Sequence, residues 1–300
     1  MSSGFSVELC LIEGKIASVL LDDEREIRSA AFYAPQASAQ LGDLYVVKIL
    51  KSVSGLSGAF VSLGEVGEGF LPYRKHLSFQ EGDFLAASVT REAQHGKGIR
   101  LKAEPEIEIP QTLQLEKKPV LIRKAKSLLE NWADLYPDIQ FVSPQPEILL
   151  LLPQALRERF RIDYEAFDSC LKEDFLALGE RHFSLTLKID ASITVTEALT
   201  AIDLDAPNGA GFEENRQAIH KLFDEIELRQ LGGVILIDPA GLPVKKRFAL
   251  TKFIQEDAKQ KAKWKNLEVR GATPSGMIEL SVKRGRRSLF ETLQELSLTN

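Results

Sequence analysis

Residues 192–238 read SITVTEALTAIDLDAPNGAGFEENRQAIHKLFDEIELRQLGGVILID and contain two apolar runs on either side of a helical one. Alternating apolar residues, Ile193, Val195, Leu199 and Ala201, predict one long strand over Ser192–Asp203. Apolar residues at helical spacing predict a helix over Glu213–Gln230, which the Gly232-Gly233 pair ends. Val234–Ile237 is apolar throughout and predicts a second, buried strand. Together these form a strand–helix–strand unit of normal size.

An aspartate ends each of these two predicted strands. If the strands are adjacent and parallel, Asp203 and Asp238 emerge at the same edge of the sheet, where α/β proteins build their sites. Mg²⁺ binds through one or two carboxylates and keeps several waters, so the pair is a candidate magnesium site. Asp205 is then a third ligand or a residue that positions water. Spacing alone leaves other roles open, since an aspartate at a strand end also caps turns and helices or accepts a phosphoryl group.

Residues 41–103 are rich in glycine and contain short runs of β-type sequence. Turn signals separate these runs, which are Leu44–Leu50, Gly58–Leu63, Gly69–Leu71, Phe84–Arg91 and Gly98–Lys102. So many short strands in such a segment are typical of a small barrel. Phe60 and Phe70 fall on neighbouring runs, where they either stack single-stranded bases or fill the core. Lys97 lies between two glycines and is a candidate phosphate contact.

The rest of the chain mixes strands and helices. The patterns predict strands in residues 5–33, a helix over Ala125–Tyr136, a buried strand at Ile148–Leu152 and mostly helix over Arg161–Leu178. A basic amphipathic helix is predicted over Lys245–Trp264, and two short strands over Glu268–Lys283. The fold class is therefore α+β or α/β.

Composition restricts the class of protein. Of the 300 residues, 44% are hydrophobic and 27% are charged, which is ordinary for a folded protein. The formal net charge is −5, yet residues 245–300 hold 13 basic and six acidic residues, which form either a polyanion-facing surface or a solvated helix face. Cys10 and Cys170 are too far apart in sequence for a CxxC metal pair, and no run approaches the roughly 20 apolar residues of a membrane span. We expect a cytoplasmic protein that does not enter a membrane.

Three segments resemble the bacterial ribonuclease E/G family, namely Thr196–Asp203, Leu228–Asp238 and Gly276–Arg284. The barrel region resembles that family's S-one-type OB domain through Ala59-Phe60-Val61 and Gly69–Pro72. The resemblance implies an OB-type β-barrel inserted in an RNase H-like subdomain, followed by a DNase I-like catalytic subdomain. The implied boundaries are 1–40 and 111–178 for the RNase H-like subdomain, 41–104 for the barrel, and 179–300 for the catalytic subdomain.

The resemblance also implies a reaction. The chain is expected to be an endoribonuclease that cleaves single-stranded RNA by Mg²⁺-assisted phosphodiester hydrolysis, in RNA processing (that of ribosomal RNA included) or decay. Asp203 and Asp238 stand where the family has its two magnesium ligands, and Asp205 would orient water or the outer shell of the ion.

RNA-binding residues follow from the same resemblance. Phe60, Phe70 and Lys97 stand at the family's RNA-gripping positions of the barrel, which favours base stacking over core packing for both rings. Lys283 and Arg284 are candidates for neutralising the RNA backbone, as are Arg286 and Arg287.

The sequence departs from the family pattern in several places. Asp205 stands where the family usually has Asn, and no acid follows Asp238 in Pro239-Ala240-Gly241. The pocket that senses a 5′-monophosphate and the zinc-binding cysteine pair have no counterpart, so no zinc-linked oligomer is expected, although a homodimer formed in another way stays open. Two alternatives therefore remain: an RNA-binding paralogue with weak or no catalysis, and a non-RNA enzyme that reuses the two acids.

Overall fold

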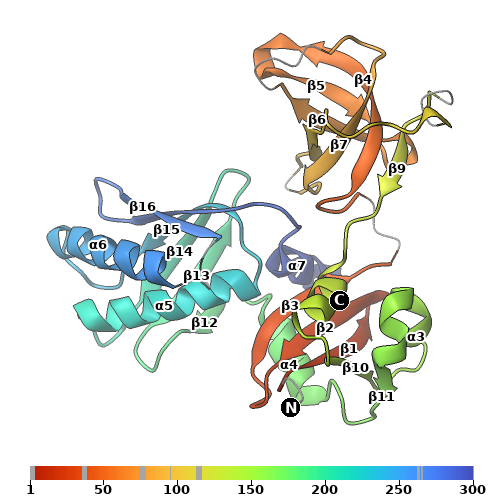
Figure 1. The fold of residues 1–300 in the computed structure, drawn as a ribbon. Coiled ribbons are helices and arrows are strands. Elements are labelled where there is room, and N and C mark those ends of the chain that lie inside the picture. Colours follow the sequence, from red (N-terminus) through yellow and green to blue (C-terminus); the bar gives the residue numbers. More distant parts are fainter. Residues whose placement is uncertain are drawn as a thin grey trace.

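The computed structural model describes residues 4–35, 39–73, 79–94, 96–112, 117–261, 264 and 266–299. The described strands form three sheets, one of which closes into a barrel (Figure 1). The fold is thus mixed α+β, as predicted. None of the helices in the described ranges is both long enough and apolar enough to cross a membrane.

The first sheet combines segments that are far apart in the sequence. Its order is β11-β10-β1-β2-β3, in which β1, β2 and β3 are antiparallel neighbours and β10 and β11 continue parallel to β1. The strands are β1 (Ser6–Ile12), β2 (Lys15–Leu21), β3 (Ile27–Tyr33), β10 (Gln140–Ser143) and β11 (Phe160–Ile162). Three helices accompany them: α2 (Leu128–Leu135), α3 (Ile148–Leu151) and α4 (Ser169–Ala177). The barrel lies between β3 and β10 in the chain.

The barrel is a closed sheet of five strands. The strands are β4 (Leu44–Val53), β5 (Gly58–Ser62), β6 (Glu68–Pro72), β7 (Phe84–Arg91) and β8 (Ile99–Ala103). Their order is β5-β6-β8-β7-β4, and pairing of β4 with β5 closes the ring. Only the β6–β8 pair in this ring is parallel. Strand β9 (Val120–Arg123) pairs with the first residues of β4. This closed five-stranded arrangement is compatible with the predicted OB-type barrel.

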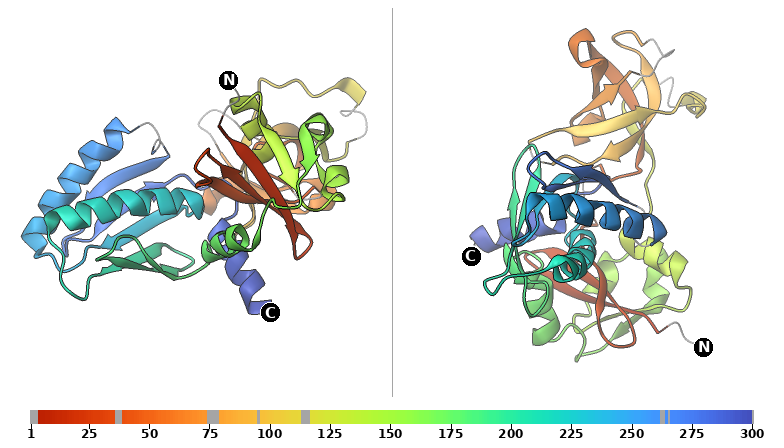
Figure 2. Two further views of the ribbon diagram at one scale, coloured as in Figure 1. Left: turned by 90° about the horizontal axis from the view of Figure 1, so that it is seen from below. Right: turned by 90° about the vertical axis from the view of Figure 1, so that its left-hand side faces the viewer.

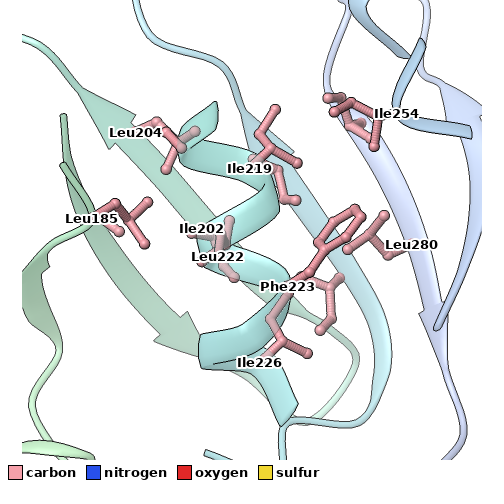
Figure 3. Close-up of a cluster of buried hydrophobic side chains, with 14 of the residues drawn as sticks. Leu185, Ile202, Leu204, Ile219, Leu222, Phe223, Ile226, Ile254 and Leu280 are labelled. Atoms are coloured by element: carbon pink, nitrogen blue, oxygen red, sulfur yellow. The ribbon is translucent and has the colours of Figure 1, made fainter. Parts of the chain in front are cut away.

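The third sheet carries the strand–helix–strand unit. Its order is β12-β13-β14-β15-β17-β16, formed by β12 (His182–Ser184), β13 (Asp190–Val195), β14 (Thr200–Asp205), β15 (Gly233–Asp238), β16 (Leu267–Ala272) and β17 (Ile278–Val282). Helices α5 (Phe212–Leu228) and α6 (Val244–Gln260) cover one face. The predicted helix face of Ile219, Leu222, Phe223 and Ile226 is fully buried there against Ile202 and Leu280 (Figure 3).

Helix α7 (Leu289–Thr299) joins the first and third sheets. Figure 2 shows it between them. Phe290 belongs to the apolar core of the third sheet, whereas Leu289 and Leu293 pack with the buried residues of β2 and α4. The backbone N–H of Phe290 also donates to the carbonyl of Arg229, 3.1 Å away. The first and third sheets are therefore held together by apolar burial on both sides of one helix.

Three sequence predictions were wrong. Ser192–Asp203 is not one strand: Thr196 Oγ1 accepts from the N–H of Leu199 and donates to its carbonyl, and the chain turns back so that β13 and β14 are antiparallel. Ile148–Leu152 is not a buried strand but the short helix α3, in which Leu150 is 73% exposed. Helix α4 starts only at Ser169, because Arg161 lies in β11 and Asp168 accepts from the N–H of Leu171 as its N-cap.

The contact between α5 and α6 makes stability depend on pH. His220 Nε2 and Arg216 Nε both lie 2.9 Å from the Asp257 carboxylate. Burial, ahead of the charge of Lys261, lowers the pKa of His220 from its ordinary value of 6.5. A histidine with a lowered folded-state pKa binds fewer protons when folded, so its contribution is complete above pH 6.5 and is lost as the pH falls through the folded-state pKa.

We therefore expect the free energy of unfolding to fall as the pH goes from 7.5 to 5. Urea unfolding at both values measures this fall, and His220→Gln, which cannot titrate, should show a smaller one. An equal fall in both proteins would remove His220 as its source. The pKa of Asp257 is lowered, first by its hydrogen bond to Arg216, and this affects the free energy of unfolding only in more acidic solution.

Candidate functional site

Asp203 and Asp238 lie directly opposite each other in the third sheet. The strands β14 and β15 are adjacent and parallel, and these two residues are paired in their register, as the sequence led us to expect. In β14 the side chains of Ile202 and Leu204 are buried under α5, while Asp203 and Asp205 are exposed on the opposite face. Because side chains alternate along a strand, both Asp203 and Asp238 project from the face that α5 and α6 leave uncovered.

Arg247, in the first turn of α6, contacts one carboxylate oxygen of Asp238. Its Nη1 forms an ion pair with Asp238 Oδ1, and its Nε donates to the carbonyl of Leu242 at 2.7 Å. Gly276 has a positive φ of 86° and lies under the Arg247 side chain, which a Cβ at this position would approach to 2.9 Å. The guanidinium is thereby fixed beside Asp238, and Asp238 Oδ2 has no partner within the described ranges.

Asn215 fixes the turn that follows Asp238. This fully buried side chain donates from Nδ2 to the carbonyls of Gly211 and Ala240, and its Oδ1 accepts from the N–H of Ala240. The buried Pro239–Ala240 turn thus obtains its hydrogen bonds from α5. Asn215 was missed in the sequence because it lies on the apolar side of a helix with no nearby motif.

Asn215→Leu is expected to destabilise the fold. It leaves the N–H and carbonyl of Ala240 buried without partners, and each unsatisfied group costs about 1–3 kcal/mol. Chemical denaturation should therefore show a loss of several kcal/mol, whereas Asn208→Leu, in the exposed loop before α5, should change stability little. A loss no larger than that of the control would contradict this role for Asn215.

Asp205 faces a neighbouring hollow on the same face. It is paired in register with Asp190, whose Oδ1 accepts from Ser184 Oγ at 2.6 Å. A pocket of about 520 Å³ is lined by Asp203, Asp205 and Asp190, together with His182, Phe183, Ser184, Ala191 and Ser192. Asp238 does not line this pocket, so Asp203 stands between it and the Asp238–Arg247 pair.

Glu279 and Asp190 are acids of this face that the sequence motifs did not single out. Glu279 lies on β17, opposite Leu236 of β15, and alternates with the buried Ile278 and Leu280. The alternation of apolar residues in β17 indicates that Glu279 faces away from the core. Its place near Asp238 depends on the strand order, in which β17 adjoins β15. In the described ranges, no three His, Cys, Asp or Glu side chains converge closely enough to hold a metal ion together.

The donor set fits a magnesium ion bound mainly by water. Asp203 and Asp238 supply hard carboxylate oxygens from adjacent strands, and one oxygen of Asp238 is not taken by Arg247. Mg²⁺ commonly binds proteins through one or two carboxylates and keeps its remaining waters. The two carboxylates are thus ligands of the kind that this ion takes, but they do not form a closed protein cage.

On the barrel, Phe60 and Phe70 are neighbours on the outer surface. They are paired in register across β5 and β6, with ring centroids 5.7 Å apart and ring planes at 70°. Phe60 is 39% exposed, whereas Ala59 and Val61 on either side of it are fully buried. The rings are thus not part of the barrel core, and the Phe70 ring covers Gly58, where a side chain would collide with it.

Basic residues continue this pair across the barrel. Register pairing connects Lys51 to Phe60, Phe70 to Arg100, and Arg100 to Arg91, so the five form one row over β4, β5, β6, β8 and β7. We call these residues the barrel row. Aromatic rings stack bases and cations contact phosphates, so the row combines both elements of a single-stranded nucleic-acid surface. Lys51 and Arg100 were missed because their place in the row depends on strand pairing.

The remaining predicted RNA contacts lie near the junction of barrel and third sheet. Lys97 Nζ donates to the carbonyl of Glu197 at 3.4 Å, which links the barrel loop to the β13–β14 turn. Lys283 is exposed. Arg284 Nε donates to the carbonyl of Gly232 at 3.2 Å, and its guanidinium occupies the space that a side chain at Gly233, with φ +98°, would need. Arg284 therefore lies at the C-terminal end of α5, outside the pocket of Asp203 and Asp205.

Comparison with known proteins gives one finding. Residues 166–285 match the family model of the Ribonuclease E/G family, and this range contains Asp203, Asp205, Asp238 and Arg247. No curated protein matches the chain. The match covers all six strands of the third sheet and both helices on it. Through this segment the chain is similar to the ribonuclease E/G family.

Proposed function

We propose that the protein is an endoribonuclease that cleaves single-stranded RNA by Mg²⁺-assisted phosphodiester hydrolysis, in RNA processing or decay. The match of residues 166–285 to the ribonuclease E/G family supports the ribonuclease class. The observation that carries the proposal is the register pairing of Asp203 with Asp238 on an exposed face, within the matched segment. Two carboxylates so placed repel each other unless a cation compensates their charge.

Each residue then has a distinct task. Asp203 and Asp238 would hold Mg²⁺, which polarises a phosphoryl oxygen and lowers the pKa of a water when bound. Arg247 keeps one Asp238 oxygen fixed, so this carboxylate is oriented before the substrate arrives. Asp205 projects from the same face as Asp203 and would accept a hydrogen bond from the attacking water.

The barrel row would grip the RNA. Phe60 and Phe70 would each stack one base, and Lys51, Arg100 and Arg91 would neutralise phosphates. The hydrogen bond of Lys97 to Glu197 supports a continuous path, because it connects this barrel to the sheet that carries Asp203.

The subdomain assignment is part of the proposal. The barrel order supports an OB domain within residues 41–104. The first sheet, assembled from residues before and after the barrel, supports an RNase H-like subdomain at 1–40 and 111–178. Residues 179–300 would be the DNase I-like catalytic subdomain, and the protein would act in the cytoplasm.

An RNA-binding paralogue with weak or no catalysis is the second candidate. One observation favours it, since Arg247 already neutralises Asp238 and competes with a metal ion for its charge. Asp205 in the place of the family's usual Asn points the same way.

One experiment separates the two candidates. Purified protein is mixed with a fluorescent single-stranded RNA in Mg²⁺ or in EDTA, and both binding anisotropy and cleavage on a denaturing gel are read. The proposal expects binding in both buffers and internal cleavage in Mg²⁺ only. Binding without cleavage would overturn it in favour of the paralogue, and cleavage gained by Asp205→Asn would then identify the cause.

A further inference from the structure

A cavity of about 420 Å³ lies where the barrel meets the first and third sheets. We call it the junction cavity. The barrel side contributes Leu41 and Gln94, β3 contributes Arg28 and Ser29, and the segment after β17 contributes Lys283, Arg284 and Arg286. It is separate from the pocket that Asp203 and Asp205 line.

Gln94 lines this cavity with an unused hydrogen-bond donor. Its side chain is only 8% exposed, and its Nε2 has no hydrogen-bond partner among the residues that the structure describes. Its backbone is fixed, because its N–H donates to the carbonyl of Lys97 and its carbonyl accepts from the N–H of Lys97. A buried amide donor without an acceptor is destabilising, so this position favours a ligand that accepts a hydrogen bond.

Arg286 adds an unneutralised charge. Within the described ranges its guanidinium makes no hydrogen bond or ion pair, and burial lowers its pKa, although the nearby charge of Glu92 acts in the opposite direction. The Glu92 oxygens accept from the backbone N–H groups of Leu41 and Arg287 instead. An arginine stays protonated at neutral pH, so its partial burial is costly unless an anion accompanies it.

The other lining charges have the same sign. Arg28, Lys283 and Arg284 are basic, and Glu227 is the one acid among the described lining residues. Arg28 is paired with Asp22, and Arg284 is held by the Gly232 carbonyl through Nε only. The cavity thus combines an excess of positive charge with hydrogen-bond donors from all three parts of the molecule.

We propose that the junction cavity binds a phosphate group, which accepts from Gln94 Nε2 and pairs with Arg286 and Arg284. Phosphate has the required negative charge and enough acceptor oxygens for donors on several sides. It is carried either by the RNA backbone, in which case the inference rests on the proposed function, or by free inorganic phosphate. In both cases the bound group connects the barrel to the third sheet beside the Glu92 N–H to Gly285 carbonyl hydrogen bond.

Thermal unfolding with inorganic phosphate tests the site. The full chain is heated in EDTA with sodium phosphate, or with sodium chloride at the same ionic strength. Phosphate should raise the unfolding temperature of the wild type more than chloride does. Gln94→Glu places a carboxylate at the donor position and should abolish this gain, as should Arg286→Gln. Lys172→Gln, which removes one exposed charge on α4, should keep it.

Arg286→Gln keeps the test valid if Gln94→Glu does not fold, because the Arg286 side chain is not fully buried. A wild type that gains no more from phosphate than from chloride would overturn the proposal. So would an equal gain in all four proteins. Neither result bears on cleavage by the wild type, so failure here is distinguishable from failure of the proposed nuclease.

A second experiment, on RNA binding, shows whether the phosphate belongs to the RNA backbone or is free inorganic phosphate. Binding of a single-stranded RNA with 5′-hydroxyl ends is measured in EDTA for the wild type and Gln94→Glu. A loss of affinity of about tenfold or more would assign the site to the RNA backbone. Unchanged RNA affinity, together with the lost phosphate effect, would assign it to free phosphate.

Discussion

Asp203→Asn is expected to lose RNA cleavage while it keeps RNA binding. The substitution retains the shape of the side chain but removes one of the two charges that face each other across β14 and β15. Loss of one preorganised electrostatic group commonly costs about a hundredfold to a thousandfold in rate. Because Asp203 is exposed and its strand neighbours Ile202 and Leu204 form the core, the fold should be unaffected.

The control for Asp203→Asn is the same substitution at an exposed aspartate outside the third sheet. Asp174, exposed on α4 of the first sheet, is such a residue, and Asp174→Asn should cleave at the wild-type rate. Single-turnover cleavage and fluorescence anisotropy on the same RNA give both quantities. If Asp203→Asn cut RNA as fast as the wild type, the site would not be at this pair of strands.

The Phe60→Ala/Phe70→Ala double variant is expected to lose most of its affinity for single-stranded RNA. Base stacking on an aromatic ring is worth about 1–3 kcal/mol, so removing two rings should raise the Kd at least tenfold. Stability should change much less than for a core aromatic, because the barrel interior is filled by the neighbours of Phe60 in β5, Ala59 and Val61, and not by the rings.

Phe253→Ala is the matched control for the aromatic pair. Phe253 is 49% exposed on α6 and contacts Phe212 and Arg216, away from the barrel. This variant should bind RNA as the wild type does. Unchanged RNA affinity in the double variant, measured by anisotropy on folded protein, would return both rings to a packing role.

The helical part of the third sheet was predictable from the sequence because its signals are local. The buried face of Ile219, Leu222, Phe223 and Ile226 is a direct consequence of helical spacing, and the apolar Val234–Ile237 run is a strand as expected. The sequence placed Asp203 and Asp238 at one edge on the condition that their strands are adjacent and parallel, and the pairing of β14 with β15 meets this condition.

The errors arose where local patterns were ambiguous. The run from Ser192 to Asp203 has apolar residues in alternation on both sides of Glu197, yet its centre turns back because the Thr196 side chain satisfies both backbone groups of Leu199. Ile148–Leu152 is apolar, but a short apolar run does not distinguish a strand from a buried helical turn. Here Ile148 and Leu152 are buried in the core and Leu149 packs against it, whereas Leu150 and Leu151 are exposed.

The site beyond the two acids depends on long-range contacts. Arg247 reaches Asp238 only once α6 is packed on the third sheet, and the row of Lys51, Phe60, Phe70 and Arg100 exists only once the barrel strands are paired. No spacing in the sequence encodes either contact. The resemblance identified the aromatic pair but not its basic neighbours.

The chemistry of the new RNA ends tests directly whether Asp203 and Asp238 support Mg²⁺-assisted hydrolysis. Wild-type protein and a uniformly labelled single-stranded RNA are incubated with Mg²⁺ and with EDTA, and the new termini are identified by mass spectrometry. Hydrolysis at the Asp203–Asp238 site predicts internal cuts in Mg²⁺ only, with each new pair of ends being a hydroxyl and a phosphate monoester. Cleavage that persists in EDTA, or that leaves 2′,3′-cyclic phosphates as products, would contradict Mg²⁺-assisted hydrolysis at this site.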